Sequence, residues 1–251
     1  MMGMEFELVR SRRKTLGLTV LPDGTVQVKA PLTLSNQIIR RWVESKAGWI
    51  AARQQELARR AQVQAAYTLS EGQTLPLLGR RLPIRLEPGC SAARLDGETA
   101  VLPLGENSPE PVALRRQAAQ NLYRQLARPY LTKLLDQWSP RMGLCPTGLH
   151  ITSARTRWGS CSGKNSLSFS WRLLLCPPEC VEYVVVHELA HIAPHDHSPR
   201  FWQTVQRQLP DYRQRQEALR RFGHVLAEEG WMSDLCTPAG NPGPGGDGRR
   251  G

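Results

Sequence analysis

The sequence predicts an α+β protein, in which a β-rich N-terminal part with a basic helix precedes a helical region that holds a small antiparallel or mixed sheet. Two observations predict this class. Polar and apolar residues alternate along residues 5–28, which is the period of β-strands. Apolar residues recur every three or four positions in three later segments, residues 35–60, 112–138 and 181–191, as in helices that bury one face.

The composition is that of an ordinary globular protein, with 40% hydrophobic and 22% charged residues. This excludes a chain that is disordered throughout, and six cysteines in 251 residues are too few for a secreted disulfide scaffold. The opening residues lack the apolar core of a signal peptide, and no apolar run approaches the roughly 18 residues of a membrane-spanning helix. We therefore expect a cytoplasmic protein without a membrane segment.

The N-terminal part is expected to contain strands followed by a helix. The pair Asp23-Gly24 lies between alternating segments and predicts a tight hairpin turn. Ser35 or Asn36 can cap a helix that extends to about Arg60. Its apolar face is expected to contain Ile38, Ile39, Trp42, Val43 and Trp49.

The opposite face of this helix is basic. It carries Arg40, Arg41, Lys46, Arg53, Arg59 and Arg60. Residues 10–60 hold eleven Lys or Arg against three Asp or Glu, within a chain of net charge +11. A solvated helix face is the simplest explanation of these charges. The alternative is a contact with nucleic acid, a nucleotide or another anion.

The later elements follow the same patterns. Further strands are expected at residues 82–86, 99–102, 157–161 and 167–175. Helical spacing predicts a long helix over residues 112–138, which Pro129 should kink or split.

A polar connection at residues 105–111 marks the expected domain boundary. The chain then divides into a β-rich region with the basic helix (1–104) and a catalytic region (105–236). The last residues, 237–251, are rich in Gly and Pro and are expected to be a disordered tail.

One segment carries the chemistry, H-E-L-A-H at residues 187–191. On a helix, residues four apart lie on one face, so His187 and His191 can hold the same metal ion. Glu188 can then act as general base on a water molecule held by that ion. Pro177 and Pro178 fit a helix start just before the motif. The pattern therefore predicts a metal site on a helix.

A third ligand is needed, because catalytic zinc usually has three protein ligands and an open position. His197 has the offset of the last ligand in H-E-x-x-H-x-x-G-x-x-H, although Pro194 stands where that pattern has Gly. The Ser-Pro pair after His197 predicts the start of a new helix, which would hold this residue in place. We favour His197. His195 is the alternative, and Asp196 is either a remote ligand or, more simply, a turn residue.

Two groups of residues together resemble the YgjP-like metallopeptidase family, whose relatives include the WLM and SprT-like zinc peptidases. One is H-E-L-A-H at 187–191 with H-S-P-R-F-W at 197–202, and the other is R-W-G-S-C at 157–161 with W-R-L-L at 171–174. The stretches S-R-R-K-T-L, V-K-A-P and W-I in the N-terminal part also match, so the resemblance covers about residues 5–225. One departure is Ser170, where the family commonly has Asn, a change expected to alter a hydrogen bond beneath the metal site.

The resemblance implies a zincin-like fold for residues 105–236, with the H-E-x-x-H helix against the small sheet. It also implies Zn²⁺ held by His187, His191 and His197, Glu188 as the base, and a peptide or protein as substrate. We therefore expect a zinc-dependent hydrolase of the metallopeptidase type. Two alternatives stay open: the metal site hydrolyses nucleotides or other phosphoanhydrides, or the chain is a nucleic-acid-binding module with structural zinc.

Arg157 is a candidate for substrate binding, because its strand should lie close to the metal helix. The alternative for Arg157 is a structural ion pair. Two further residues, Tyr212 and His224, are weaker candidates for donors to a developing oxyanion. Structural roles are expected for Ser160, Cys161, Cys176, Cys180 and Tyr183.

Overall fold

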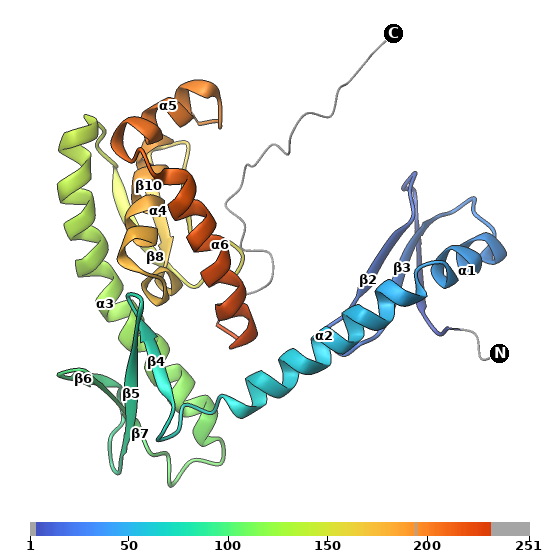
Figure 1. The fold of residues 1–251 in the computed structure, drawn as a ribbon, viewed down its shortest axis with the longest axis horizontal. Helices are drawn as coiled ribbons and strands as arrows, with labels where there is room; N and C mark the ends of the chain where they lie inside the picture. Colours follow the sequence, from blue (N-terminus) through green and yellow to red (C-terminus); the bar gives the residue numbers. More distant parts are fainter. Residues whose placement is uncertain (1–3, 194, 232–251) are drawn as a thin grey trace. The chain divides into compact units, whose positions relative to one another are not determined.

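The computed structural model describes residues 4–193 and 195–231, which form two compact units that divide between Ala66 and Tyr67 (Figure 1). The described residues contain three small sheets, each with both parallel and antiparallel pairs, together with helices. The predicted α+β class with mixed sheets is therefore confirmed. The tail expected at 237–251 lies outside the described residues.

The first unit contains the predicted hairpin. Strands β2 (Gly17–Val20) and β3 (Val26–Pro31) pair antiparallel, and β1 (Glu7–Ser11) pairs parallel with β3. Gly24 occupies the turn with a φ of 87°, a conformation that favours glycine. The Asp23 carboxylate accepts a hydrogen bond from the Thr25 N–H at 2.9 Å and stabilises the turn.

The prediction of a single helix over residues 35–60 is wrong, because the structure has two helices, α1 (Asn36–Glu44) and α2 (Ala47–Ala66). Ser35 caps α1 as predicted. The helix ends where the Ser45 hydroxyl donates to the Trp42 carbonyl oxygen at 2.6 Å, which competes with helix continuation. This break changes which apolar residues are buried. Ile39 and Val43 are buried as expected, whereas Ile38 and Trp49 are more than half exposed.

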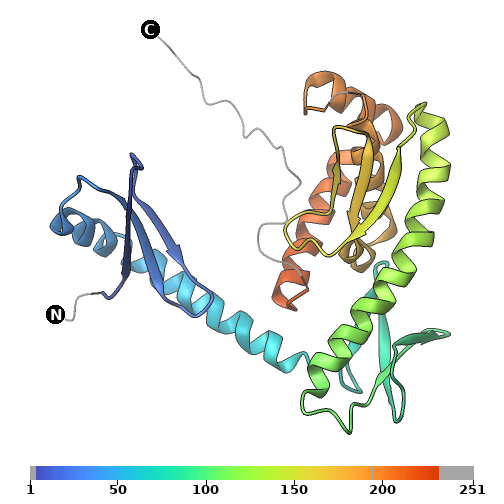
Figure 2. The ribbon, with the colours of Figure 1, turned by 180° about the vertical axis from the view of Figure 1, so that it is seen from behind.

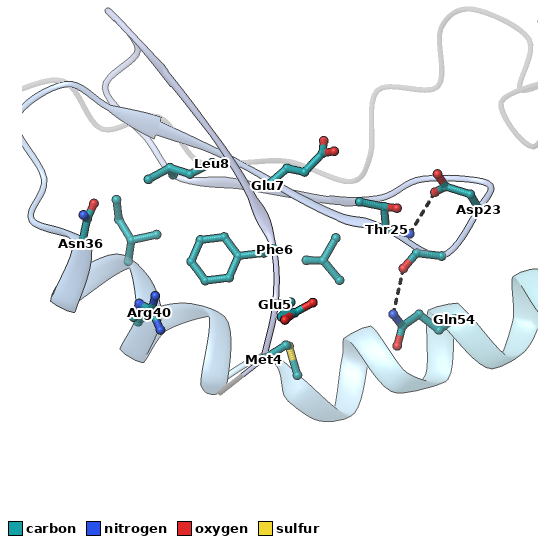
Figure 3. A pocket seen from close by; sticks show the side chains of 13 residues that line it. Met4, Glu5, Phe6, Glu7, Leu8, Asp23, Thr25, Asn36, Arg40 and Gln54 are labelled. Carbon is teal, nitrogen blue, oxygen red and sulfur yellow. Dashed lines mark hydrogen bonds between the residues drawn. The ribbon is translucent and has the colours of Figure 1, made fainter. Parts of the chain in front are cut away.

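A hollow of about 950 Å³ lies between the N-terminal strand, the hairpin and α1 (Figure 3). The Phe6 ring occupies the middle of this view, with Arg40 and Gln54 on the helices beside it. The Gln54 side-chain amide donates to the Gly24 carbonyl oxygen at 2.8 Å, so α2 is tied to the hairpin turn.

The second unit begins with a four-stranded sheet in the order β4-β5-β7-β6. Its strands are β4 (Thr74–Leu77), β5 (Arg80–Glu87), β6 (Arg94–Asp96) and β7 (Thr99–Pro103). Their buried residues share one hydrophobic core with the helices that follow, and the buried Tyr123 hydroxyl donates to the Pro76 carbonyl oxygen. The structure therefore groups residues 67–104 with the later helices, whereas the sequence grouped them with the N-terminal region.

Helix α3 (Pro111–Met142) is continuous through Pro129 and Pro140, so of the two effects expected of Pro129, a kink or a split, the split does not occur. Pro129 is exposed, and water can therefore reach the carbonyl oxygen that its ring leaves without a partner. The helix ends at Gly143, which has a left-handed φ of 65°.

The other sheet of the second unit has three strands in the order β8-β10-β9. Its strands are β8 (Gly148–Thr152), β9 (Gly159–Cys161) and β10 (Ser166–Ser170). The prediction that this strand extends to residue 175 is wrong, because after Ser170 the chain forms a 3-10 helix, η1 (Trp171–Leu175). The Ser170 hydroxyl accepts from the Arg172 N–H and donates to the Ala154 carbonyl oxygen at 2.8 Å, which fixes this turn.

Three helices complete the unit: α4 (Pro178–Ala190), α5 (Pro199–Gln208) and α6 (Tyr212–Glu228). Figures 1 and 2 show α4 against the β8-β10-β9 sheet, between α3 and α6. Every residue from Tyr183 to Ala190 is buried, so α4 is the central element of the unit. None of the described helices has both the length and the apolar character required to cross a bilayer.

Candidate metal centre

The first two histidines lie at the C-terminal end of α4, one helical turn apart. Pro177 is the N-cap residue of this helix and Pro178 its first residue, as the sequence predicts, and His191 occupies its C-cap position. The ring centroids of His187 and His191 are 5.0 Å apart. The H-E-x-x-H motif therefore presents two imidazoles on one face of a buried helix.

His197 comes from the segment between α4 and α5. Ser198 is the N-cap residue of α5 and Pro199 its first residue, as predicted, although the Ser198 side chain forms no capping hydrogen bond. The Asp196 carboxylate instead accepts from the Ser198 N–H at 3.0 Å. Hydrogen bonds from the Ser198 side chain and from this N–H lower the pKa of Asp196. This turn places the ring centroid of His197 4.7 Å from the ring centroid of His191.

The three imidazoles form a cluster with the geometry of a metal site. One ligand atom from each of His187, His191 and His197 lies within 4.8 Å of the others. The two Nε2 atoms of His187 and His197 are 3.3 Å apart. Two nitrogen ligands at about 2.0–2.1 Å from a tetrahedral ion would lie about 3.3 Å apart, so the cluster fits such an ion. His195 and Asp196 are exposed and do not belong to the cluster.

The surroundings keep His187 neutral, which is the form that binds a metal. Burial, with the charges of His191 and His197, lowers the pKa of His187 to about 3. The buried Tyr183 hydroxyl lies 3.5 Å from Nδ1 of His187 and leaves Nε2 directed at the cluster. Sequence reasoning assigned Tyr183 to the core and missed this contact, although the i, i+4 spacing of the two residues indicates it.

Two aromatic residues of α5 pack against the cluster. Phe201 stacks on His191 with ring centroids 4.4 Å apart, and it also contacts the rings of His187 and His197. Trp202 lies 5.7 Å from His197 and stacks on Tyr212. These rings limit the rotation of the imidazoles.

Glu188 lies beside the cluster without being part of it. Its side chain is 7% exposed and lines the same cavity as the histidines. Burial raises the pKa of Glu188 to about 8, and the charge of Arg157 opposes that rise. A carboxylate with a pKa near neutrality can both accept and return a proton.

The cavity has a volume of about 290 Å³. Its other wall comes from the segment R-W-G-S-C, with Arg157 exposed at the edge. Arg172, which is buried, holds the preceding loop by donating to the carbonyl oxygens of Ser153, at 2.8 Å, and Ala154. Arg172 also donates to the Trp231 carbonyl oxygen, so the end of the described chain supports the loop that carries Arg157.

The comparison with protein families identifies the family of the chain. Residues 14–222 match the family described as YgjP-like, metallopeptidase domain, which is most of the chain. The chain belongs to the YgjP-like family. The predicted resemblance is therefore confirmed, and with it the placement of the motifs in a metallopeptidase domain.

The YgjP-like assignment rests on the family match alone. The crystal structure of the metallopeptidase zymogen of Pyrococcus abyssi abylysin matches 39% of this chain and 93% of its own, at 19% identity and a TM-score of 0.33. A comparison with curated protein sequences finds no match.

The remaining candidates lie at the edge of this candidate metal centre or outside it. Ser160 and Cys161 line the cavity, but burial and the charge of Glu188 raise the pKa of the Cys161 thiol and disfavour a nucleophilic thiolate. Tyr212 and His224 do not line the cavity. The residues Cys176 and Cys180 are buried and belong to no metal-ligand group among the described residues.

Proposed function

We propose that this YgjP-like protein is a zinc-dependent peptidase. The observation that carries the proposal is the arrangement of three imidazoles, with Nε2 atoms of His187 and His197 3.3 Å apart, beside a buried carboxylate. Family membership supports a metallopeptidase and hence a protein or peptide substrate. The zinc ion, the base and the substrate contact are the parts that we propose.

His187, His191 and His197 would hold the ion. Three imidazoles are ligands that suit zinc, and bound zinc would lower the pKa of a water molecule and polarise the scissile carbonyl. In residues 4–193 and 195–231 the ligand group comprises only these three residues, which would leave one position of a four-coordinate ion open. An open position favours a catalytic over a structural site.

Glu188 would be the general base. It takes one proton from water as the water oxygen attacks the carbonyl carbon, and it returns that proton to the amine nitrogen when the C–N bond breaks. Burial raises the pKa of Glu188, and a bound cation would favour its carboxylate form, which is the form that accepts a proton.

Arg157 would bind the substrate. Its guanidinium is exposed at the edge of the cavity, and the loop before it is held by Ser170 and Arg172. A guanidinium in this position can donate to a peptide carbonyl oxygen or pair with an acidic side chain.

We further propose a nucleic-acid contact on the first unit, as an addition to the peptidase site. Residues 4–66 hold eleven basic and five acidic residues. Arg40, Arg41 and Lys46 are exposed on or beside α1, and Trp49 is 53% exposed. Exposed basic side chains suit phosphate binding, and an exposed indole ring can stack on a base.

The first test is metal content by elemental mass spectrometry on protein purified without a metal-affinity tag. We expect about one zinc per chain, a sharp loss in His197→Ala, and no loss in the control His195→Ala, because His195 lies outside the cluster. Zinc lost from His195→Ala but kept by His197→Ala would contradict the assigned ligands.

The second part of the test compares wild type with Glu188→Gln on peptide and nucleotide pools. The variant should keep its zinc and lose peptide hydrolysis, because Gln cannot accept the proton from water. Peptide hydrolysis that survives in Glu188→Gln contradicts the mechanism. Glu188-dependent hydrolysis of nucleotides alone would favour the phosphoanhydride alternative.

A further inference from the structure

Gly159, the first residue of β9, lies against the Glu188 side chain. A Cβ atom at residue 159 would come within 2.7 Å of Cγ, 2.8 Å of Oε1 and 2.9 Å of Cδ of Glu188. These are the three nearest atoms, and all belong to the side chain of the proposed base. Non-bonded carbon atoms prefer about 3.5–4.0 Å, so a methyl group and the present carboxylate position exclude each other.

The backbone at Gly159 has little freedom to move away. Gly159 pairs with Phe169 of β10, which is fully buried, and the Ser170 N–H donates to the Trp158 carbonyl oxygen at 2.8 Å. On the other side, α4 is buried from Tyr183 to Ala190. A side chain at residue 159 would therefore displace the Glu188 carboxylate, which lines the cavity of about 290 Å³.

The reason for glycine at this position is proximity and not conformation. Gly159 is absent from the glycines with positive φ among the described residues, so an alanine could adopt its backbone angles. We propose that Gly159 is a positioning residue for the proposed base: the missing side chain creates the space that holds the Glu188 carboxylate beside the metal ligands. This inference rests on the proposed function of Glu188.

The test is Gly159→Ala, with Gly163→Ala as matched control. Gly163 lies in the turn after β9, its φ is not positive, and a Cβ there meets nothing within 4 Å. We expect Gly159→Ala to keep its zinc and its KM while kcat falls by about 100-fold, the size of effect that a shift of about 1 Å produces in a catalytic group. Gly163→Ala should leave kcat, KM and zinc content unchanged. An unchanged kcat in Gly159→Ala overturns the inference.

A second measurement does not depend on activity. Replacing glycine by alanine at an unstrained position restricts the unfolded chain and raises the unfolding midpoint. Gly163→Ala should therefore raise the unfolding midpoint of the wild-type protein. Gly159→Ala should raise the midpoint when Glu188 is replaced by alanine, but should not raise it when Glu188 is present. Equal shifts in the two backgrounds would show that residue 159 does not meet Glu188, and the inference would be wrong.

These outcomes separate the inference from the proposed function. The midpoint comparison tests the contact whether or not the chain hydrolyses peptides, whereas hydrolysis that survives Glu188→Gln would contradict the function alone. Where Gly159→Ala does not fold, recovery of folding by the added Glu188→Ala change supports the inference. A double variant that also fails to fold contradicts it, because the clash would then involve other atoms.

Discussion

At the scale of single residues, the site depends on charged groups that differ in burial. Glu188 is buried and its pKa is raised, whereas Arg157 is exposed, and the two interact across the edge of one cavity. In the proposed function, the buried base would act on the reacting atoms, and the exposed guanidinium would contact parts of a substrate that do not react. These positions predict separate kinetic effects for the two residues.

Arg157→Ala is expected to raise KM for a peptide substrate about tenfold or more and to change kcat and zinc content little. The reason is that a hydrogen bond from a charged donor contributes about 1.5–3 kcal/mol, and it is made equally in the bound and transition states. Steady-state kinetics with metal analysis measures this. The control is Arg155→Ala, an exposed neighbour that does not line the cavity. A fall in kcat at constant KM would show that Arg157 acts through Glu188 instead of on the substrate.

At the scale of the elements, α3 continues through a proline that was expected to kink or split it. Pro129 lies inside a continuous helix of 32 residues, where it removes one hydrogen bond and crowds the preceding turn. Inside a helix, proline is about 3 kcal/mol less favourable than alanine, whereas its restriction of the unfolded chain favours the folded state by about 1 kcal/mol. Pro129→Ala should therefore stabilise the protein by about 2 kcal/mol. Denaturant unfolding measures the change, with the exposed neighbour Arg128→Ala as control. An equal or lower stability for Pro129→Ala would contradict a continuous helix.

Sequence reasoning succeeded where the relevant residues are close together in the chain. Spacing within residues 187–197 placed the histidines on one helix and the turn after it, and the structure brings His187, His191 and His197 together. It failed where position depends on pairing between distant segments. The contact of Gly159 with Glu188 follows from the register of β9 on β10, and no local pattern predicts it. The sheet of residues 74–103 similarly joins the later helices because its buried faces need a partner.

At the scale of the whole molecule, the charge is unevenly divided. The first unit carries a net charge of +6, from eleven basic and five acidic residues, and the remaining 185 residues carry +5, from 22 basic and 17 acidic residues. Part of the charge on α2 is neutralised, because Arg59 and Arg60 both pair with Glu56. Arg40, Arg41 and Lys46, which are exposed on α1 or next to it, are therefore better candidates for contact with a polyanion than the basic residues of α2.

The full chain should bind a single-stranded oligonucleotide with an affinity that falls steeply with salt. Each basic contact releases counterions, so replacing Arg40, Arg41 and Lys46 by Ala should reduce the slope of log K against log salt by about 2, or about 0.7 for each contact. Fluorescence anisotropy over a series of salt concentrations measures this slope. Peptide hydrolysis by the same variant should be unchanged, because none of these residues belongs to the metal centre.

The control removes the same number of charges from the other unit. Arg128, Lys133 and Lys164 are exposed, so changing all three to Ala lowers the net charge equally without touching the first unit. If binding depends on a surface of the first unit, this control keeps the wild-type salt slope, since phosphate contacts act locally at physiological ionic strength. Equal losses in both triple variants would instead show a general attraction to a basic protein, and the nucleic-acid contact on the first unit would be wrong.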